Sequence, residues 1–411
     1  MRGRLSTAAL GHPVRTLLIT YAGSRLLVLL ALAVAAHWFQ NPAGVGHLEP
    51  GLGDMFGLWD ATWYRDIALH GYPVPAPIDP RTGTMTYSAW AFFPLLPWIL
   101  TPLTRVGLPF VASAVVLDLL LGGVATVLVW RLFRGPAAPA LDPVRERLAL
   151  VAAALWCLHP ATTVLLQPYT EALAAALLTG AVLLVMRRRY VGAGVLALAL
   201  GLTRAVAPAL GLVVLVHLAA RWRAEVAVGA RPLAGGRLGA AFLLVATAVS
   251  GVLWPAIVGV RTGVPNAFFA IQANWGQRPE DGPFVAWVRW AWQSRGALGV
   301  VTLLLCVVAY VALVLGRHGR WLSVEVRALA LAYPLYLLAV VRPITSMWRF
   351  TLLDVPLAAL LASVCLRTWR GGSIVPHWVG RAVVVGTALC AGVLWWTSVL
   401  WVYLPWGSHP P

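Results

Sequence analysis

The sequence predicts an all-α, multi-pass membrane protein. The chain has 411 residues, of which 60% are hydrophobic and 11% charged, and its mean hydropathy is +0.80. Apolar runs long enough to cross a hydrocarbon core of about 30 Å recur along the chain. The formal net charge is +17, but the basic residues form short clusters between apolar runs, as a topology signal does. We therefore expect membrane lipids, and no nucleic acid, as partners.

The distribution of arginine sets the predicted orientation, because basic loops tend to stay in the cytoplasm. A first span from about Thr16 to Ala36 follows Arg15. It is longer than the apolar core of a signal peptide, so we expect it to be retained, with the N-terminus inside. The next clear span runs from about Phe110 to Trp130. Basic residues near this and later span ends, all placed inside, are Arg131, Arg134, Arg145, Arg147, Arg187–Arg189, Arg221–Arg223, Arg237, Arg317, Arg320, Arg327, Arg367, Arg370 and Arg381.

This orientation gives about eleven spans in a single membrane domain, residues 1–411, with the C-terminus outside. It leaves two polar external loops, residues 37–108 and 261–296. Within the first loop, residues 91–107 form a short apolar segment with three prolines, which favours an interfacial or re-entrant helix. The absence of lysine, together with abundant Ala, Gly and Pro, indicates a GC-rich bacterial genome and hence the plasma membrane.

Five acidic residues crowd the first external loop, and two of them stand in an aromatic segment compatible with a helix. Asp60 lies between Trp59 and Trp63, a setting that can hold a carboxylate at a membrane surface. Asp66 falls about 120° away on a helical wheel, so the two acids do not form a pair, and Asp66 faces water or Arg65. The other three are flanked by Gly or Pro and are expected to be solvated: Glu49, Asp54 and Asp79.

Polar residues also stand where a later span meets the outer face. Gln167, Tyr169 and Glu171 are candidate ligand-binding residues. An ordinary helix start, with Thr170 as N-cap and Glu171 in the first turn, remains equally open.

Two ionisable residues lie inside predicted spans. Asp118 stands in the middle of an apolar run, and Arg25 is its possible partner. Ionisable groups within a membrane are costly and are usually functional or paired. We expect Arg25 and Asp118 to form a structural ion pair.

Two arginines fall on the outer side, where the topology signal gives them no purpose. Arg204 lies at one outer tip, and Arg349 lies at another beside Arg342 and Asp354. The planar guanidinium fork suits phosphate. For either arginine alone, the alternative is contact with a lipid headgroup or an ion pair between Arg349 and Asp354. Because Asp60 is predicted on the same face, a functional site explains the two arginines and the acid together better than these alternatives do.

A phosphate-bearing substrate reached from outside, within the membrane, is most naturally a polyprenyl phosphate. A carboxylate at Asp60 is suited to take a proton from an acceptor hydroxyl as it attacks a sugar's anomeric carbon, while arginines hold the departing phosphate. Aromatic rings stack on sugar faces. The sequence contains no P-loop, no strand-associated GxGxxG and no DxD, and "EDG" at residues 280–282 is interpreted as a solvated turn, so no metal or other cofactor is indicated.

Several motifs, in order, resemble the PIG-V family, the second mannosyltransferase of glycosylphosphatidylinositol synthesis, and its bacterial relatives. They are "LWDATWYRDIALHGYP", "AFFPLLPWIL", "QPYTEAL", "LTRAVAPALG" and "MWRFTLLDVPL". Asp60 stands at the acidic position of the first-loop motif. The motif's other matching residues are Trp59, Trp63, Tyr64, Gly71 and Tyr72. Arg349 with Phe350 stands where the family more often has Arg-Tyr.

The resemblance implies a GT-C glycosyltransferase fold, a polyprenyl-phosphate-mannose donor, an active site outside the cytoplasm and inversion at the anomeric carbon. In a bacterium the acceptor is expected to be a glycolipid, a cell-envelope glycan or a protein. A polytopic transporter or lipid flippase is the alternative from another functional class. No clear internal repeat supports that alternative, and only Arg25 and Asp118 favour it.

Overall fold

The computed structural model describes residues 12–40, 50–135, 142–231, 236–277, 282–367, 374–375 and 377–401. Apart from two isolated β-bridges, every regular element in these residues is helical. The elements are α2 (Pro13–Trp38), η1 (Leu52–Met55), α3 (Asp60–His70), η2 (Ala89–Ala91), α4 (Leu95–Arg105), α5 (Phe110–Arg134), α6 (Pro143–Cys157), η3 (Thr162–Leu166), α7 (Glu171–Met186), α8 (Tyr190–Gly201), α9 (Ala207–Ala227), α10 (Arg237–Thr262), α11 (Ala267–Gln272), η4 (Ala273–Trp275), α12 (Val285–Leu315), α13 (Val324–Val340), α14 (Met347–Thr351), α15 (Val355–Leu366) and α16 (Trp378–Leu400).

Five helices within the described residues are long and apolar enough to cross a membrane: α2, α5, α10, α12 and α16. This is the pattern of a multi-pass membrane protein, but the prediction of about eleven spans was wrong. Several of the other apolar runs form helices too short for the task. For example, α8 and α15 have 12 residues each, or roughly 18 Å at 1.5 Å per residue, against a hydrocarbon core of about 30 Å.

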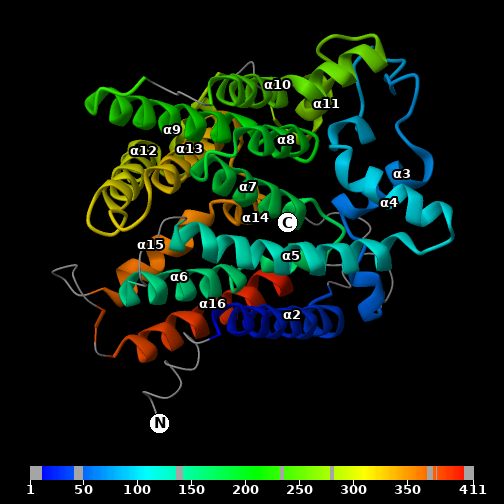
Figure 1. The fold of residues 1–411 in the computed structure, drawn as a ribbon. Coiled ribbons are helices and arrows are strands. Elements are labelled where there is room, and N and C mark those ends of the chain that lie inside the picture. Colours follow the sequence, from blue (N-terminus) through cyan, green and yellow to red (C-terminus); the bar gives the residue numbers. More distant parts are fainter. Residues whose placement is uncertain are drawn as a thin grey trace.

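The helices pack side by side, with α3, α4 and α11 gathered at one end of the bundle (Figure 1). The prediction of a short helix within residues 91–107 is confirmed, because α4 spans only 11 residues. It packs on α3 and on the start of α5. The basic end of α5, at Arg131 and Arg134, lies at the opposite end of the bundle from α4.

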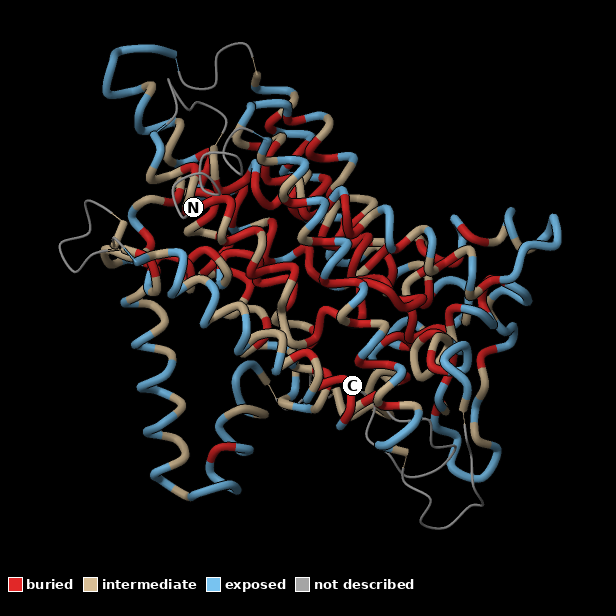
Figure 2. Tube along the Cα trace, turned by 90° about the horizontal axis from the view of Figure 1, so that it is seen from below, coloured by how far each residue is buried: buried red, intermediate tan, exposed pale blue. Residues whose placement is uncertain are grey.

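Buried residues run through the middle of the bundle (Figure 2). By contrast, α12 stands away from the body, and only 6% of its most apolar window is buried. Its helical path is broken at Arg295 and Gly296, which have non-helical backbone angles.

A second, aromatic-rich core joins the two predicted external loops. Tyr72 stacks on Trp90 with ring centroids 4.4 Å apart, and Trp90 stacks on Trp254 of α10 at 5.7 Å. The amide of Gln272 donates to the Ala91 carbonyl at 2.9 Å. These contacts fix the segment that carries α3 against α10 and α11.

Candidate functional site

A cavity of about 1200 Å³ opens at the end of the bundle that carries α3. Its walls come from α3 and the segment before it, from the tip between α8 and α9, from α10 and α11, and from α13 and α14. Six of the ten residues predicted to form the site line this cavity: Trp59, Asp60, Trp63, Tyr64, Arg204 and Arg349.

Asp60 is the first residue of α3, and the turn before it has an unusual backbone. Trp59, at the N-cap position, has φ 57° and ψ −120°, a region that residues other than glycine rarely adopt. The Tyr169 hydroxyl donates to the Leu58 carbonyl at 3.2 Å and accepts from the Asp60 amide at 3.3 Å. Tyr169 thus holds the turn that presents Asp60 to the cavity.

Asp60 forms an ion pair with Arg349 of α14. Arg349 Nη1 lies 2.5 Å from Asp60 Oδ2, and the side chains are 9% and 20% exposed, respectively. The partly exposed carboxylate is therefore reachable from the cavity while one of its oxygens is fixed by a charge-assisted hydrogen bond.

Arg204 forms a second ion pair, with Glu171 at the start of α7. Arg204 Nη1 lies 2.5 Å from Glu171 Oε1, and the Glu171 side chain is fully buried. The same nitrogen donates to the Thr170 hydroxyl at 3.1 Å. Arg349 Nε lies 3.8 Å from the same Glu171 oxygen, so the two pairs form one network.

The aromatic ring of Phe350 lies against both guanidinium groups. The Cζ atoms of Arg204 and Arg349 are 5.1 Å and 5.3 Å from its centroid, and Arg349 also lies 5.2 Å from the ring of Tyr169. These are cation–π distances. Phe350 therefore supports the two arginines without a hydroxyl group.

The electrostatics of the network favour charged arginines. Burial alone lowers the pKa of Arg349, but the carboxylates of Asp60 and Glu171 outweigh this effect and raise it above its usual value. For Arg204, burial and the neighbouring Arg349 lower the pKa, and Glu171 raises it more. Both groups stay protonated, and each acid of the network faces a permanent positive charge.

The remaining four predicted site residues lie behind the cavity and do not line it. Tyr72 donates to the Phe92 carbonyl at 2.9 Å. Gln167 and Glu171 are fully buried, and Tyr169 is 1% exposed. The sequence left open whether residues 167–171 bind a ligand or only start a helix. A helix does start at Glu171, but the Thr170 side chain does not cap it. That these four residues bind substrate stays a prediction; Glu171 and Tyr169 position residues that do line the cavity.

Asp66 faces water, as predicted. Its side chain is 55% exposed and lies 2.8 Å from His70 Nδ1. Four residues with predicted positions lie outside the described residues. They are Glu49, Glu280 and Asp281, which were predicted to be solvated, and Arg370, which was predicted to lie on the cytoplasmic side.

The sequence analysis missed the aromatic wall that the second loop contributes. Trp275 of η4 lines the cavity, with its ring centroid 5.9 Å from Trp63, 5.7 Å from Phe92 and 4.6 Å from Tyr87. A tryptophan in a polar loop was the only available signal. Its placement beside the first loop depends on tertiary packing.

The predicted pair of Arg25 and Asp118 is absent from the described structure. Arg25 instead donates to the Thr162 carbonyl at 2.8 Å, and also to the Thr162 hydroxyl. Backbone carbonyls at the end of a helix satisfy a guanidinium as well as a carboxylate does. Asp118 is fully buried, and neither carboxylate oxygen has a hydrogen-bond partner of good geometry.

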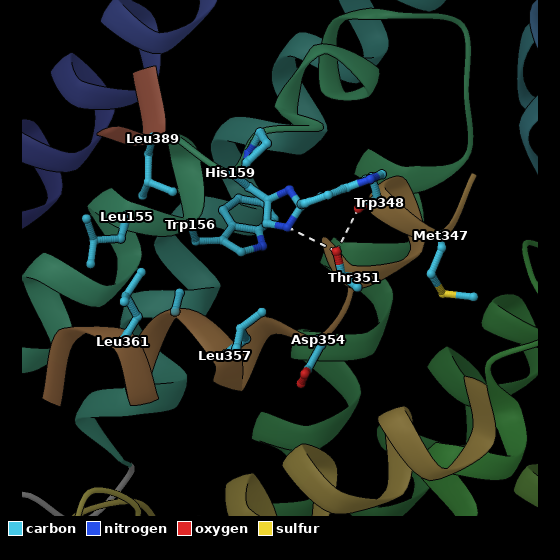
Figure 3. A pocket seen from close by; sticks show the side chains of 12 residues that line it. Leu155, Trp156, His159, Met347, Trp348, Thr351, Asp354, Leu357, Leu361 and Leu389 are labelled. Atoms are coloured by element: carbon cyan, nitrogen blue, oxygen red, sulfur yellow. Dashed lines mark hydrogen bonds between the residues drawn. The ribbon is translucent and has the colours of Figure 1, made fainter. Parts of the chain in front are cut away.

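Asp354 does not pair with Arg349 but lines a second, apolar cavity of about 390 Å³ between α6, α14, α15 and α16 (Figure 3). Burial raises the pKa of Asp354 to about 7, although Tyr310 donates to its Oδ2 at 2.8 Å. Across the cavity, burial lowers the pKa of His159 to about 4. His159 Nε2 lies 3.2 Å from the Thr351 hydroxyl.

The described residues contain no group of three or more His, Cys, Asp or Glu that could hold a metal ion. The large cavity thus combines a partly exposed carboxylate, two arginines and an aromatic wall. Comparison of the sequence with protein-family models and with curated proteins found no matching family and no matching protein.

Proposed function

We propose that the protein is a membrane glycosyltransferase that transfers mannose, or another hexose, from a polyprenyl-phosphate-linked donor to a glycolipid or cell-envelope glycan. The observation that carries the proposal is the ion pair of Asp60 with Arg349 in a cavity that also has an aromatic wall. The resemblance of the sequence motifs to the PIG-V family supports it. On the predicted topology, the reaction takes place on the extracytoplasmic side of the plasma membrane.

In the proposed reaction, Asp60 acts as the general base. It takes the proton from the acceptor hydroxyl as that oxygen forms a bond to the anomeric carbon. The bond from this carbon to the phosphate oxygen breaks, the phosphate leaves with the electron pair, and the configuration of the carbon inverts. Arg349 fixes one Asp60 oxygen, and the other is left for the acceptor.

Arg349 and Arg204 are proposed to hold the phosphate as charge develops on it. Each guanidinium has five N–H donors, and the ion pairs with Asp60 and Glu171 use only some of them. Trp63 and Trp275 are proposed to stack on sugar rings.

A transporter or lipid flippase is the alternative. One observation favours it: Asp118 is buried within the candidate span α5 and has no partner of good geometry, as an ion-coupling residue in a transporter often is.

The deciding experiment uses the full-length protein reconstituted in liposomes. Synthetic polyprenyl-phosphate-mannose with a radiolabelled sugar is supplied, together with membrane lipids from the source organism as acceptors. We expect label to appear in glycolipid or glycan only in liposomes that contain the protein. Movement of the donor between leaflets without transfer of the sugar would instead establish the alternative.

A further inference from the structure

The short helix α14 lies between the two cavities. Its Arg349 lines the large cavity, whereas Met347, Trp348 and Thr351 line the small one (Figure 3). The helix has five residues, and isolated helices shorter than about 12 residues are marginally stable in water. Contacts with other elements must therefore set the position of α14, and with it the position of the Arg349 guanidinium.

The three residues that follow Arg349 are each held by a side chain from another part of the protein. Two of them are held by their backbone carbonyls, which accept hydrogen bonds of 2.9 Å. These bonds run from Tyr333 of α13 to Phe350 and from Trp156 of α6 to Leu352. The third residue, Thr351, is held by its hydroxyl, which lies 3.2 Å from Nε2 of His159 in the turn after α6. Arg349 is thus placed by bonds that its neighbours make.

The hydrogen bonds of His159 fix which of its ring nitrogens carries the proton. Nδ1 lies 3.2 Å from the backbone N–H of Ala161, which can only donate, so Nδ1 is the acceptor. Burial lowers the pKa of His159 to about 4, so the ring is neutral at pH 7 and its one proton is on Nε2. Nε2–H therefore donates to the Thr351 hydroxyl, which in turn donates to the Trp348 carbonyl at 2.7 Å (Figure 3).

Packing does little to fix α14 on the side of His159. The small cavity of about 390 Å³ lies directly beside this helix. Side chains that face an open space lack the dispersion contacts that fix residues in a close-packed core. On its other side, α14 is joined to α3 by the ion pair of Arg349 with Asp60. The hydrogen bond from His159 therefore holds α14 on the side where packing leaves it room to shift.

We infer that His159 is a positioning residue for the proposed transfer reaction: through Thr351 it holds α14, and α14 places the Arg349 guanidinium against Asp60 and the donor phosphate. This inference rests on the proposed transferase function. His159 does not line the large cavity, so it touches neither the substrate nor Asp60 there. Its effect on transfer has to pass through Arg349, and this requirement separates a positioning role from a purely structural one.

The experiment is a double-mutant cycle between His159 and Arg349, with transfer measured at matched membrane abundance. His159→Phe keeps an aromatic ring but removes the N–H donor. In the parent chain we expect it to lower transfer about fivefold or more, the scale of one lost hydrogen bond. In a chain that carries Arg349→Ala, the same substitution should change the remaining transfer by less than about twofold, because no guanidinium is left to position. His159→Gln, which retains an N–H donor, should stay within about twofold of the parent.

Two further variants accompany this cycle. Thr351→Val removes only the hydroxyl that His159 contacts, and it should reproduce the loss and its dependence on Arg349. His217→Phe is the matched control. His217 is a buried histidine that contacts Glu325 and Tyr190, and it lines neither cavity. Any change in transfer that it causes should be the same with and without Arg349.

Two results would overturn the inference while leaving the transferase function intact. One is an equal loss from His159→Phe in the parent and in the Arg349→Ala chain, which would mean that His159 supports the fold alone. The other is unchanged transfer in both His159→Phe and Thr351→Val. If His159→Phe does not fold, the same comparison made with Thr351→Val decides. If the parent protein transfers no sugar, the transferase function fails, and this inference fails with it.

Discussion

Arg349 Nη1 lies 2.5 Å from Asp60 Oδ2, although 289 residues separate the two in the sequence. The pair joins α14 to the first turn of α3. Removal of Arg349 leaves the Asp60 carboxylate without its counterion, which is costly, whereas removal of Asp60 leaves Arg349 beside the Glu171 carboxylate. Substitutions at the two positions should therefore differ in kind: one removes a base, and the other removes its orientation.

Asp60→Asn should reduce turnover by roughly two to four orders of magnitude, because asparagine keeps the size of the side chain but cannot accept the acceptor's proton. Donor binding should largely survive. Asp66→Asn is the control, since Asp66 is exposed and pairs with His70. Both variants are assayed at matched membrane abundance. Near-normal turnover in Asp60→Asn, or equal losses in both, would place the chemistry on another residue.

Arg349→Lys should weaken donor binding by roughly tenfold or more. Lysine keeps the charge but loses the planar fork that reaches Asp60 and packs on Phe350. Donor affinity is measured with a fluorescent polyprenyl phosphate. Arg342→Lys serves as the control, because Arg342 is an exposed arginine of the same segment. If Arg349→Ala folds and binds donor as the parent does, Arg349 has no role in phosphate binding.

Tyr169→Phe should lower kcat and leave KM nearly unchanged. The variant loses the hydroxyl that bridges the Leu58 carbonyl and the Asp60 amide, so the strained turn at Trp59 is less well held. Tyr72→Phe is the control: it loses one hydrogen bond, to the Phe92 carbonyl, where Tyr169→Phe loses two, and Tyr72 does not contact this turn. Each lost bond is worth about 1 kcal/mol of stability. Equal kcat values in the two variants would rule out a positioning role for Tyr169.

Asp354→Asn should stabilise the protein at about pH 8 and have little effect at about pH 5. The folded protein, with the pKa of Asp354 at about 7, keeps a proton that the unfolded chain releases near pH 4. The contribution of Asp354 to stability therefore decreases as the pH rises from about 4 to about 7. His159, with its pKa lowered to about 4, contributes stability that increases from about pH 4 to about 6.5. Melting temperatures in detergent test this, and an equal shift at both pH values would contradict it.

Thr82→Cys should react with a membrane-impermeant thiol reagent in intact cells. Thr82 is an exposed residue in the first predicted external loop. Arg187→Cys, at the exposed C-terminal end of α7, should react only after permeabilisation. Both are made in a chain without its four native cysteines. The opposite labelling pattern would invert the predicted topology.

The sequence predicted several residues that line the cavity, but it did not predict the ion pairs between them. Arg204 and Arg349 were selected because the positive-inside tendency gives outer arginines no purpose, and both line the cavity with Asp60. Their carboxylate partners were not predicted. Ion pairing between residues far apart in sequence depends on helix packing, and the sequence offered Asp354 as an equally reasonable partner for Arg349.

Span counting failed for a related reason. Hydropathy marks apolar residues but not the points where a helix ends. The segment after Cys157 continues as the short helix η3 and an irregular turn before α7. Because the α-helix ends there, the carbonyls of Cys157 and Thr162 are free to accept hydrogen bonds from Arg25. Arg25 therefore does not pair with Asp118, its predicted partner.

The ion pair of Asp60 with Arg349 also orders assembly in the cell. Chains are made from the N-terminus at roughly 5–20 residues per second, so Asp60 leaves the ribosome well before Arg349. Glu171 and Arg204 meet much earlier, since only 33 residues separate them. A chain that stops before α14 contains the residues of the loop motif, of the aromatic cluster and of the pair Glu171–Arg204, but not Arg349, the counterion of Asp60. The C-terminal segment thus supplies both the counterion of Asp60 and the helices α15 and α16, which pack on α6 and α2.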